Sequence, residues 1–252
     1  MKKVFLLLSF VSFTYGQNNV IEYQVLPNTT SEAFRGMMLS ASELEANLKL
    51  VTLSLVYNEN EMKFYISKTS AIVNDDINTS LLMTDIQGVY HRKNNSNDLY
   101  VEIDKYGDEE NFIIRKKWIT DWKLTDEKKM ICGHECFKAT STLKVDYGDN
   151  DINAMHPIVA WYCPEIKYSY GPKAYGHLPG MILEVDEDFA IYRAEKICTD
   201  TSNEKIALPT DKKIITESTM YDLMDETIKK AVNKCQSESK KAEILKKEDI
   251  KT

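Results

Sequence analysis

The chain has 252 residues, of which 43% are hydrophobic and 28% are charged, and its 32 basic and 39 acidic side chains give a net charge of −7. This length is sufficient for one globular domain, or at most two small ones, with a substantial core. The acidic balance gives no whole-protein electrostatic reason to bind nucleic acid or an anionic membrane, and nine Gly and six Pro exclude a collagen-like or low-complexity chain.

Residues 1–16 have the order of a secretory signal peptide. Lys2 and Lys3 precede an apolar run over 4–13, and Thr14 and Gly16 are small residues at positions −3 and −1 of a cleavage site after Gly16. The apolar run is shorter than the about 20 residues that cross a bilayer, and no later stretch is long and apolar enough. We therefore expect an exported protein without a membrane span, located in the periplasm, at the outer membrane or outside the cell.

Residues 17–215 are predicted to form a mainly β domain. Apolar and polar residues alternate over 21–25, and runs at 48–57 and 61–67 flank the turn sequence Asn58-Glu59-Asn60. Further candidate strands lie at 88–92, 99–103, 111–116, 120–124, 133–145, 158–163, 181–185 and 189–194. Many short strands joined by short turns predict an antiparallel curved sheet, a sandwich or an open barrel.

The hydrophobic period changes near residue 216. Apolar side chains recur at helical spacing from Met220 to Cys235, which predicts an amphipathic helix over 216–236 whose apolar face packs on the sheet. Residues 237–252 are rich in Lys and Glu and poor in large apolar residues, so we expect a polar tail.

Five cysteines follow the signal peptide, and in an oxidising compartment they are candidates for disulfides: Cys132, Cys136, Cys163, Cys198 and Cys235. An odd number leaves at least one of them without a partner in the chain. On a straight strand Cys132 and Cys136 are about 13 Å apart, beyond the roughly 7 Å limit for a bridge, unless the chain turns at Gly133. A bridge from Cys235 on the helix to Cys198 is plausible.

A weak metal-site candidate overlaps these cysteines. Cys132, His134 and Cys136 alternate, so they share one face of a strand, and sulfur and imidazole ligands suit copper or zinc. Side chains on one face of a straight strand are about 7 Å apart, however, so three of them hardly converge on one ion. We therefore expect no metal and no cofactor, and keep metal handling as an alternative.

The segment 158–185 combines aromatic residues with turn signals. Its aromatic residues can fill a core or form a binding surface: Trp161, Tyr162, Tyr168, Tyr170 and Tyr175. Gly171-Pro172 and Leu178-Pro179-Gly180 are turn sequences, and Pro179 and Gly180 suit the two central positions of a type II turn. Ile182 belongs to the apolar run that begins the next strand.

This segment resembles the GLPGLI family of exported Bacteroidetes proteins. The resemblance is carried by Trp161, Tyr162, Gly171, Pro172, Leu178, Pro179, Gly180, Ile182, Leu183 and Glu184, and upstream by Trp122-Lys123-Leu124, Ile131, Gly133, Cys136, Lys138 and Ala139. His177 stands at the first glycine of the family motif, with Gly176 one place early, Met181 replaces the second leucine, and His134 replaces a usual tyrosine. Cys132 and Cys163 are additions to the pattern, which suggests a Cys132–Cys163 bridge.

What the resemblance implies about activity is limited. The family is largely of unknown function and has no agreed catalytic residues, and its members are often encoded near outer-membrane uptake receptors. The resemblance therefore implies a structural role for the turn motif and assigns no catalytic residue.

The sequence favours a non-enzymatic exported protein that binds an apolar ligand, a peptide or a cell-envelope partner. It contains no G-x-G-x-x-G, P-loop, G-x-S-x-G or H-E-x-x-H motif. The alternative is a hydrolytic enzyme of unrecognised type, in which Glu165, Glu184 and Asp186 supply paired carboxylates and His134 or His177 a base. With 39 acidic residues in the chain, such pairs arise easily by chance.

Overall fold

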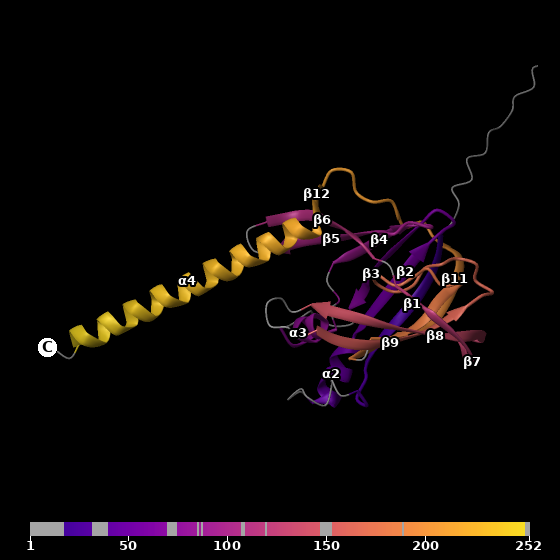
Figure 1. The fold of residues 1–252 in the computed structure, drawn as a ribbon, viewed down its shortest axis with the longest axis horizontal. Coiled ribbons are helices and arrows are strands. Elements are labelled where there is room, and N and C mark those ends of the chain that lie inside the picture. Colours follow the sequence, from indigo (N-terminus) through magenta and orange to yellow (C-terminus); the bar gives the residue numbers. More distant parts are fainter. Residues whose placement is uncertain are drawn as a thin grey trace, which may run out of the picture.

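The computed structural model describes residues 18–31, 40–69, 75–84, 86, 88–106, 109–118, 120–146, 153–187 and 189–249. The predicted signal peptide lies outside these residues. Within the described part of the chain, twelve strands form one sheet in the order β12-β6-β5-β4-β3-β2-β1-β11-β10-β9-β8-β7. The predicted mainly β fold with a C-terminal helix is confirmed (Figure 1).

The strands and helices have the following bounds. The N-terminal half contains β1 (Asn18–Pro27), α2 (Ala41–Leu48), β2 (Val51–Tyr57), β3 (Glu61–Thr69), α3 (Asp75–Met83), β4 (Val89–Lys93), β5 (Asp98–Tyr106) and β6 (Glu109–Lys117). The C-terminal half contains β7 (Lys123–Ile131), β8 (His134–Asp146), β9 (Asn153–Cys163), β10 (Met181–Asp186), β11 (Ala190–Ser202), β12 (Lys213–Thr216) and α4 (Glu217–Asp249).

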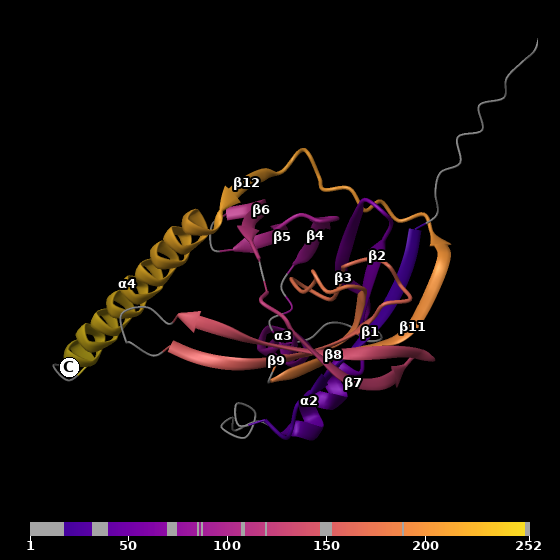
Figure 2. The ribbon, with the colours of Figure 1, turned by 45° about the vertical axis from the view of Figure 1, so that its right-hand side comes forward.

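Strand β1 joins the two halves of the sheet. It pairs with β2 on one side and with β11 on the other, and both pairings are antiparallel. The short strand β12 runs parallel to β6 at one edge, which makes the sheet mixed, and β7 forms the other edge. The sheet is open but strongly curved, and the loop between β9 and β10 lies on its concave side (Figure 2).

The hydrophobic pattern of the strands explains which face they bury. In β1, the alternate residues Ile21, Tyr23 and Val25 are at most 1% exposed, whereas the residues between them are partly exposed, as the period-two pattern predicts. In β2, five consecutive residues from Leu53 to Tyr57 are buried, because both of its faces are covered. The apolar and polar residues of 48–57 alternate less strictly than those of β1 because β2 is a central strand covered on both faces.

Two short helices, α2 and α3, fall in segments for which the sequence pattern predicts no element. Ser40 caps α2 by accepting a hydrogen bond from the Glu43 amide, and Leu44 and Leu48 of α2 enter the core. The Gln24 amide of β1 donates to the Leu48 carbonyl at the end of the helix. These helices are too short to give a clear period, and tertiary packing stabilises them.

The predicted packing of the C-terminal helix on the sheet is wrong for most of its length. Helix α4 runs continuously from Glu217 to Asp249 and extends away from the body, starting beside β12 and β6 (Figure 1). Large apolar side chains in its described part are exposed, namely Tyr221, Ile228 and Val232. Part of the concave face of the sheet is filled by the β9–β10 loop, and β12 places the helix at the edge.

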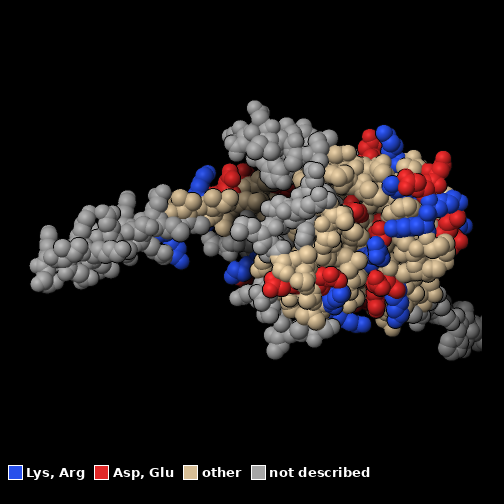
Figure 3. All heavy atoms as spheres, turned by 90° about the horizontal axis from the view of Figure 1, so that it is seen from below, with Lys and Arg blue, Asp and Glu red and all other residues tan. Residues whose placement is uncertain are grey.

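The charged residues of the body are mixed in sign. Figure 3 shows acidic and basic side chains interspersed over the described part of one face, without a large area of one sign. No helix among the described residues is long and apolar enough to cross a membrane.

Candidate functional site

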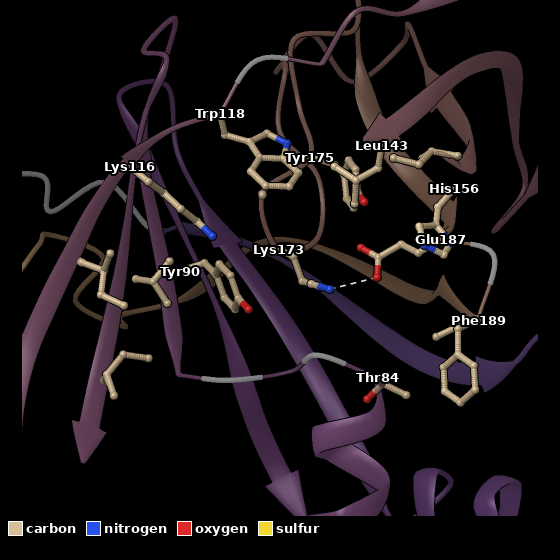
Figure 4. Close-up of a pocket in the computed structure, with 16 residues that line it drawn as sticks. Thr84, Tyr90, Lys116, Trp118, Leu143, His156, Lys173, Tyr175, Glu187 and Phe189 are labelled. Carbon is tan, nitrogen blue, oxygen red and sulfur yellow. Dashed lines mark hydrogen bonds and ion pairs between the residues drawn. The ribbon is translucent and has the colours of Figure 1, made fainter. Parts of the chain in front are cut away.

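A cavity of about 400 Å³ lies where the two arms of the curved sheet face each other. One wall comes from β4, β5 and β6, and the opposite wall comes from β8 and β9 (Figure 4). The β9–β10 loop closes a third side with Lys173, Ala174 and Tyr175. The apolar lining residues include Val101, Ile103, Ile114, Leu143, Ile158 and Phe189. The size and apolar lining are typical of a pocket for a small molecule.

One ion pair interrupts this apolar wall. Lys173 Nζ and Glu187 Oε2 lie 2.8 Å apart, and their side chains are only 7% and 15% exposed. The Lys173 ammonium also lies 5.3 Å from the centre of the Tyr192 ring, in cation–π range. The pair presents hydrogen-bonding groups to the cavity while its charges cancel.

Tyr175 connects the ion pair to the aromatic part of the wall. Burial, followed by the negative charge and hydrogen bond of Glu187, raises the pKa of the Tyr175 hydroxyl well above its usual value, so this group stays protonated. Its ring packs edge-on against Trp118, with ring centres 6.1 Å apart. The ammonium of Lys116 lies 5.3 Å from the Trp118 ring, at the same side of the cavity.

The aromatic residues singled out from the sequence do not form one surface. Tyr175 lines the cavity and belongs to the same core cluster as Tyr162, which packs with Phe137. Tyr168 stacks on Tyr170, which is fully buried. Trp161 lies under the ammonium of Lys129, 4.3 Å from its ring centre. Most of these residues therefore fill cores.

The motif glycines have steric roles in the β9–β10 loop. A Cβ on Gly171 would lie 2.9 Å from the Ile182 side chain, and one on Gly180 would collide with the Cys163 backbone. Gly180 has the positive φ that the sequence predicts, at +153°. Its amide donates to the Leu178 carbonyl at 2.8 Å, so the turn at Pro179 is one residue tighter than the predicted type II turn.

A buried arginine anchors the same loop. Arg92 of β4 is 2% exposed and its Nη2 donates to the Ala174 carbonyl, next to Lys173. Burial lowers the pKa of the Arg92 guanidinium to about 10. Gly176 passes so close to this guanidinium that no side chain fits there. The loop is thus positioned by a strand from the other half of the sheet.

No local pattern in the sequence indicates the cavity residues. Lys173 and Glu187 are common charged residues 14 positions apart, and the β4–β6 wall lies far away along the chain. Only the curvature of the sheet brings these groups together. Lys173 has one local oddity, a left-handed backbone with φ of 52°, which its residue type does not reveal.

Cys132, Cys136, Cys163 and Cys198 are free thiols, so the predicted Cys132–Cys163 bridge is not formed and no disulfide joins these four described residues. The Cys132 thiol instead donates to the Ala194 carbonyl at 3.1 Å. The side chain of Cys235, and with it the expected bridge to Cys198, lies outside the described residues.

The weak metal-site candidate of Cys132, His134 and Cys136 does not assemble. Among the described residues, the His, Cys and acidic side chains that converge are His134, Cys163 and Glu165. His134 Nδ1 lies 2.9 Å from Glu165 Oε2, on a neighbouring segment of chain. Cys132 lies in the turn before β8, where its thiol donates to the Ala194 carbonyl, and Cys136 is fully buried with its thiol donating to the His134 carbonyl.

The three carboxylates considered for acid–base catalysis have separate partners. Glu184 is 5% exposed and lies 2.6 Å from both Lys129 and Arg193. Asp186 accepts two hydrogen bonds from the Asn28 amide at 3.0 and 3.1 Å. Glu165 contacts His134, the one predicted acid–base pair that the structure brings together.

His177, the other candidate base, is engaged elsewhere. Its Nε2 donates to the Ser96 carbonyl at 3.2 Å, and its Nδ1 is buried without a hydrogen-bond partner among the described residues. Burial, together with the nearby Arg92 charge, lowers the pKa of this imidazole. A neutral imidazole inside the loop acts as a packing group.

A family model described as "Protein of unknown function (Porph_ging)" matches residues 146–184, which include β9, the motif loop and the start of β10. This match spans much less than half of the chain. No curated protein matches the sequence.

Solved structures share the fold. The structure of PNGF-II in space group C2 has 16% sequence identity and a TM-score of 0.52, over 84% of this chain and 33% of that one. The structure of PNGF-II in space group P21 has 14% identity and a TM-score of 0.52, over 84% and 34%. The chain thus spans about a third of the length of these structures, and at this identity the similarity shows the fold alone.

Proposed function

We propose that this protein is an exported, non-enzymatic β protein that binds a small, mainly apolar molecule in the cavity between the two arms of the sheet. The signal-peptide pattern of residues 1–16 supports export, to the periplasm, the outer membrane or the medium. The resemblance of 158–185 to the GLPGLI family supports the same assignment, and the matched family model covers most of that segment.

The observation that carries the proposal is the apolar cavity of about 400 Å³ with one buried ion pair in its wall. An apolar ligand gains free energy by leaving water, at about 25 cal/mol for each Å² buried. The charges of Lys173 and Glu187 cancel, so this pair offers a donor and an acceptor without a net charge, and Lys116 adds one ammonium to the lining, beside Trp118. The ligand that fits has an apolar body and a small polar group such as a hydroxyl or an amide.

The test is binding of an uncharged fluorescent hydrophobic probe, Nile red, to the purified chain. Ile114→Phe narrows the cavity from the β6 wall, and we expect it to weaken probe binding at least tenfold. Ile214→Phe is the matched control, because this isoleucine lies on β12, is 50% exposed and does not line the cavity. Equal binding by the two variants, or no binding by the parent chain, would contradict the proposal.

Native mass spectrometry of protein purified from its own source identifies the natural ligand. We expect a mass above that of the chain, because a ligand is bound, and we expect organic solvent to release this ligand. The Ile214→Phe variant should carry the ligand and the Ile114→Phe variant should not. Repeated recovery of the bare chain would argue against a carrier.

A further inference from the structure

A second cluster of reactive side chains lies on the hairpin of β8 and β9, apart from the cavity. In this hairpin Phe137 pairs with Tyr162, and the register continues in antiparallel steps along both strands. Cys136 and Cys163 come directly after this pair, at the end of the ladder, His134 begins β8, and Glu165 lies in the turn that follows β9. Because alternate residues share a face, His134 and Cys136 lie on the same side of β8.

The burial of these residues forms a gradient from the core to the surface. Cys136 and Cys163 are fully buried, whereas the side chains of His134 and Glu165 are 34% and 66% exposed. The group therefore has a thiol fixed in the core at one end and two side chains free to adjust at the other.

Three of the four residues converge. A ring nitrogen of His134, Sγ of Cys163 and a carboxylate oxygen of Glu165 all lie within 4.8 Å of one another, and His134 Nδ1 is 2.9 Å from Glu165 Oε2. Around tetrahedral zinc, with bonds of about 2.0–2.3 Å, neighbouring ligand atoms are about 3.3–3.8 Å apart. Small rotations of the His134 and Glu165 side chains are enough to bring the ligand atoms to these separations.

Hydrogen-bonded turns hold both ends of this group. The turn at Cys132 and Gly133 has positive φ at both residues and sets His134 at the start of β8. On the other chain segment, the Ile166 amide donates to the Cys163 carbonyl at 3.3 Å, and the Met181 amide donates to the Ile166 carbonyl at 3.0 Å. The backbone that carries the three side chains is thus fixed before any ion binds.

We propose that His134, Cys163 and Glu165 form a binding site for a zinc ion. Neutral imidazole, thiolate and carboxylate are ligands that Zn²⁺ accepts together. On binding, the Cys163 thiol gives its proton to solvent and Zn²⁺ takes its place on sulfur, so that thiolate and carboxylate together neutralise the charge of the ion.

Three protein ligands leave the fourth tetrahedral position open. An open cavity of about 730 Å³ adjoins the group, lined by His134 and Glu165 together with Tyr57 and Tyr168. An ion held here can therefore carry a water molecule or a ligand from solution, as zinc sites with three protein ligands do.

Cys136 has a positioning role in this arrangement. Its Sγ lies 3.7 Å from the His134 carbonyl, to which it donates, and it thereby fixes the backbone that carries the imidazole.

The test uses the full chain, reduced and freed of metal by a chelator. Co²⁺ serves as a spectroscopic probe, and Zn²⁺ affinity is measured by competition with a chromophoric chelator. We expect one ion per chain, with a thiolate-to-Co²⁺ charge-transfer absorption that Cys163→Ser abolishes. His134→Gln and Glu165→Gln should each weaken Zn²⁺ binding at least tenfold.

Two variants are matched controls. Cys198→Ser removes a thiol outside the group, and Glu135→Gln removes an exposed carboxylate next to His134 that pairs with Lys128. Both should leave metal binding within twofold of the parent chain. Because Cys163 is buried, its substitution can unfold the protein, so thermal unfolding of each variant is recorded. If Cys163→Ser does not fold, the His134→Gln and Glu165→Gln variants, which change partly exposed side chains, test the proposal.

The proposal is overturned if the reduced chain shows no thiolate absorption with Co²⁺, or if that absorption persists in folded Cys163→Ser. It is equally overturned if the His134 and Glu165 variants bind Zn²⁺ as tightly as the controls. Loss of probe binding to the other cavity has no bearing on this result, because the two sites share no lining residue.

Discussion

Lys173 Nζ and Glu187 Oε2 lie 2.8 Å apart in the wall of an otherwise mainly apolar cavity. Lys173 belongs to the loop before β10 and Glu187 to the turn after it, so the ion pair ties together the two ends of this strand. Burial removes water from both charged groups, and the attraction between them offsets part of this cost. The pair therefore contributes to the stability of the fold and also supplies hydrogen-bonding groups to the cavity.

Removing one charge should cost more than removing both. We expect Lys173→Met or Glu187→Gln to lower the free energy of unfolding by about 3–5 kcal/mol, because one buried charge loses the opposite charge of its ion pair. The double variant Lys173→Met/Glu187→Met should lose less than either single variant. Denaturant unfolding measures all three, and single losses that simply add in the double variant would contradict an interacting pair.

The unfolding free energy should depend on pH through His177. Its pKa in the folded protein lies below the ordinary 6.5, so the unfolded chain binds the proton more readily. Stability from this residue is full above pH 6.5 and decreases as the pH falls below it. His177→Asn tolerates the positive φ of 65° and removes the titrating group, so its profile should be flatter between pH 7 and pH 5.

Thermal unfolding of the parent chain and of His177→Asn between pH 7 and pH 5 measures how their stabilities differ with pH. The folded-state pKa values of Glu102 and Glu204 are also lowered. At Glu102 burial raises the pKa, but the hydrogen bonds and charges of Lys212 and His91 together outweigh it. At Glu204 the hydrogen bond from Lys63 outweighs burial. Their contributions decrease only at lower pH and are common to both chains. Parallel profiles between pH 7 and pH 5 would exclude His177 as the source.

Two glycines with positive φ should respond differently to alanine. At Gly180 a Cβ collides with the Cys163 backbone, so Gly180→Ala should cost about 2–4 kcal/mol, from strain and overpacking together. At Gly133 a Cβ meets nothing within 4 Å, and only the left-handed backbone opposes Gly133→Ala, at about 1–2 kcal/mol. Denaturant unfolding of both variants makes the comparison, and equal losses would mean that the contact at Gly180 is relieved.

Truncation should show that the outer part of α4 does not stabilise the body. The helix contacts the sheet at β12 and β6, near its start, and Ile228 and Val232 are exposed. A chain ending at Lys234 should unfold within about 0.5 kcal/mol of the full chain, as exposed positions usually do. A loss above 1 kcal/mol in denaturant unfolding would show that the removed segment packs on the body.

The strands were predictable because their signal is local. The alternation at Ile21, Tyr23 and Val25 gives β1 directly, and the turn sequence at Asn58 gives the hairpin of β2 and β3. The loop that carries Gly171 and Gly180 was likewise visible as a turn-rich segment. In each case a few neighbouring residues contain all the information needed.

The candidate sites depend on strand register and sheet curvature, which no short window contains. Glu165 lies in the turn after β9, so its contact with His134 at the start of β8 depends on the pairing of these two strands and on the path of that turn. Lys173 meets Glu187 only once the chain has folded back around β10. The wrong prediction that α4 packs on the sheet has the same cause. An amphipathic pattern indicates an apolar helix face but does not show whether the folded sheet leaves a surface to cover that face.

The pairing of β1 with β11 has a consequence for the order of folding. Tyr23 at the centre of the sheet pairs with Ala194, so the middle of the sheet can form only when about three quarters of the 252 residues have been synthesised. Pairings over such long sequence separations fold slowly, because the intervening chain must first be brought together. During synthesis the nascent polypeptide therefore remains incompletely folded, which suits passage through a translocation channel of the kind that the predicted leader would require.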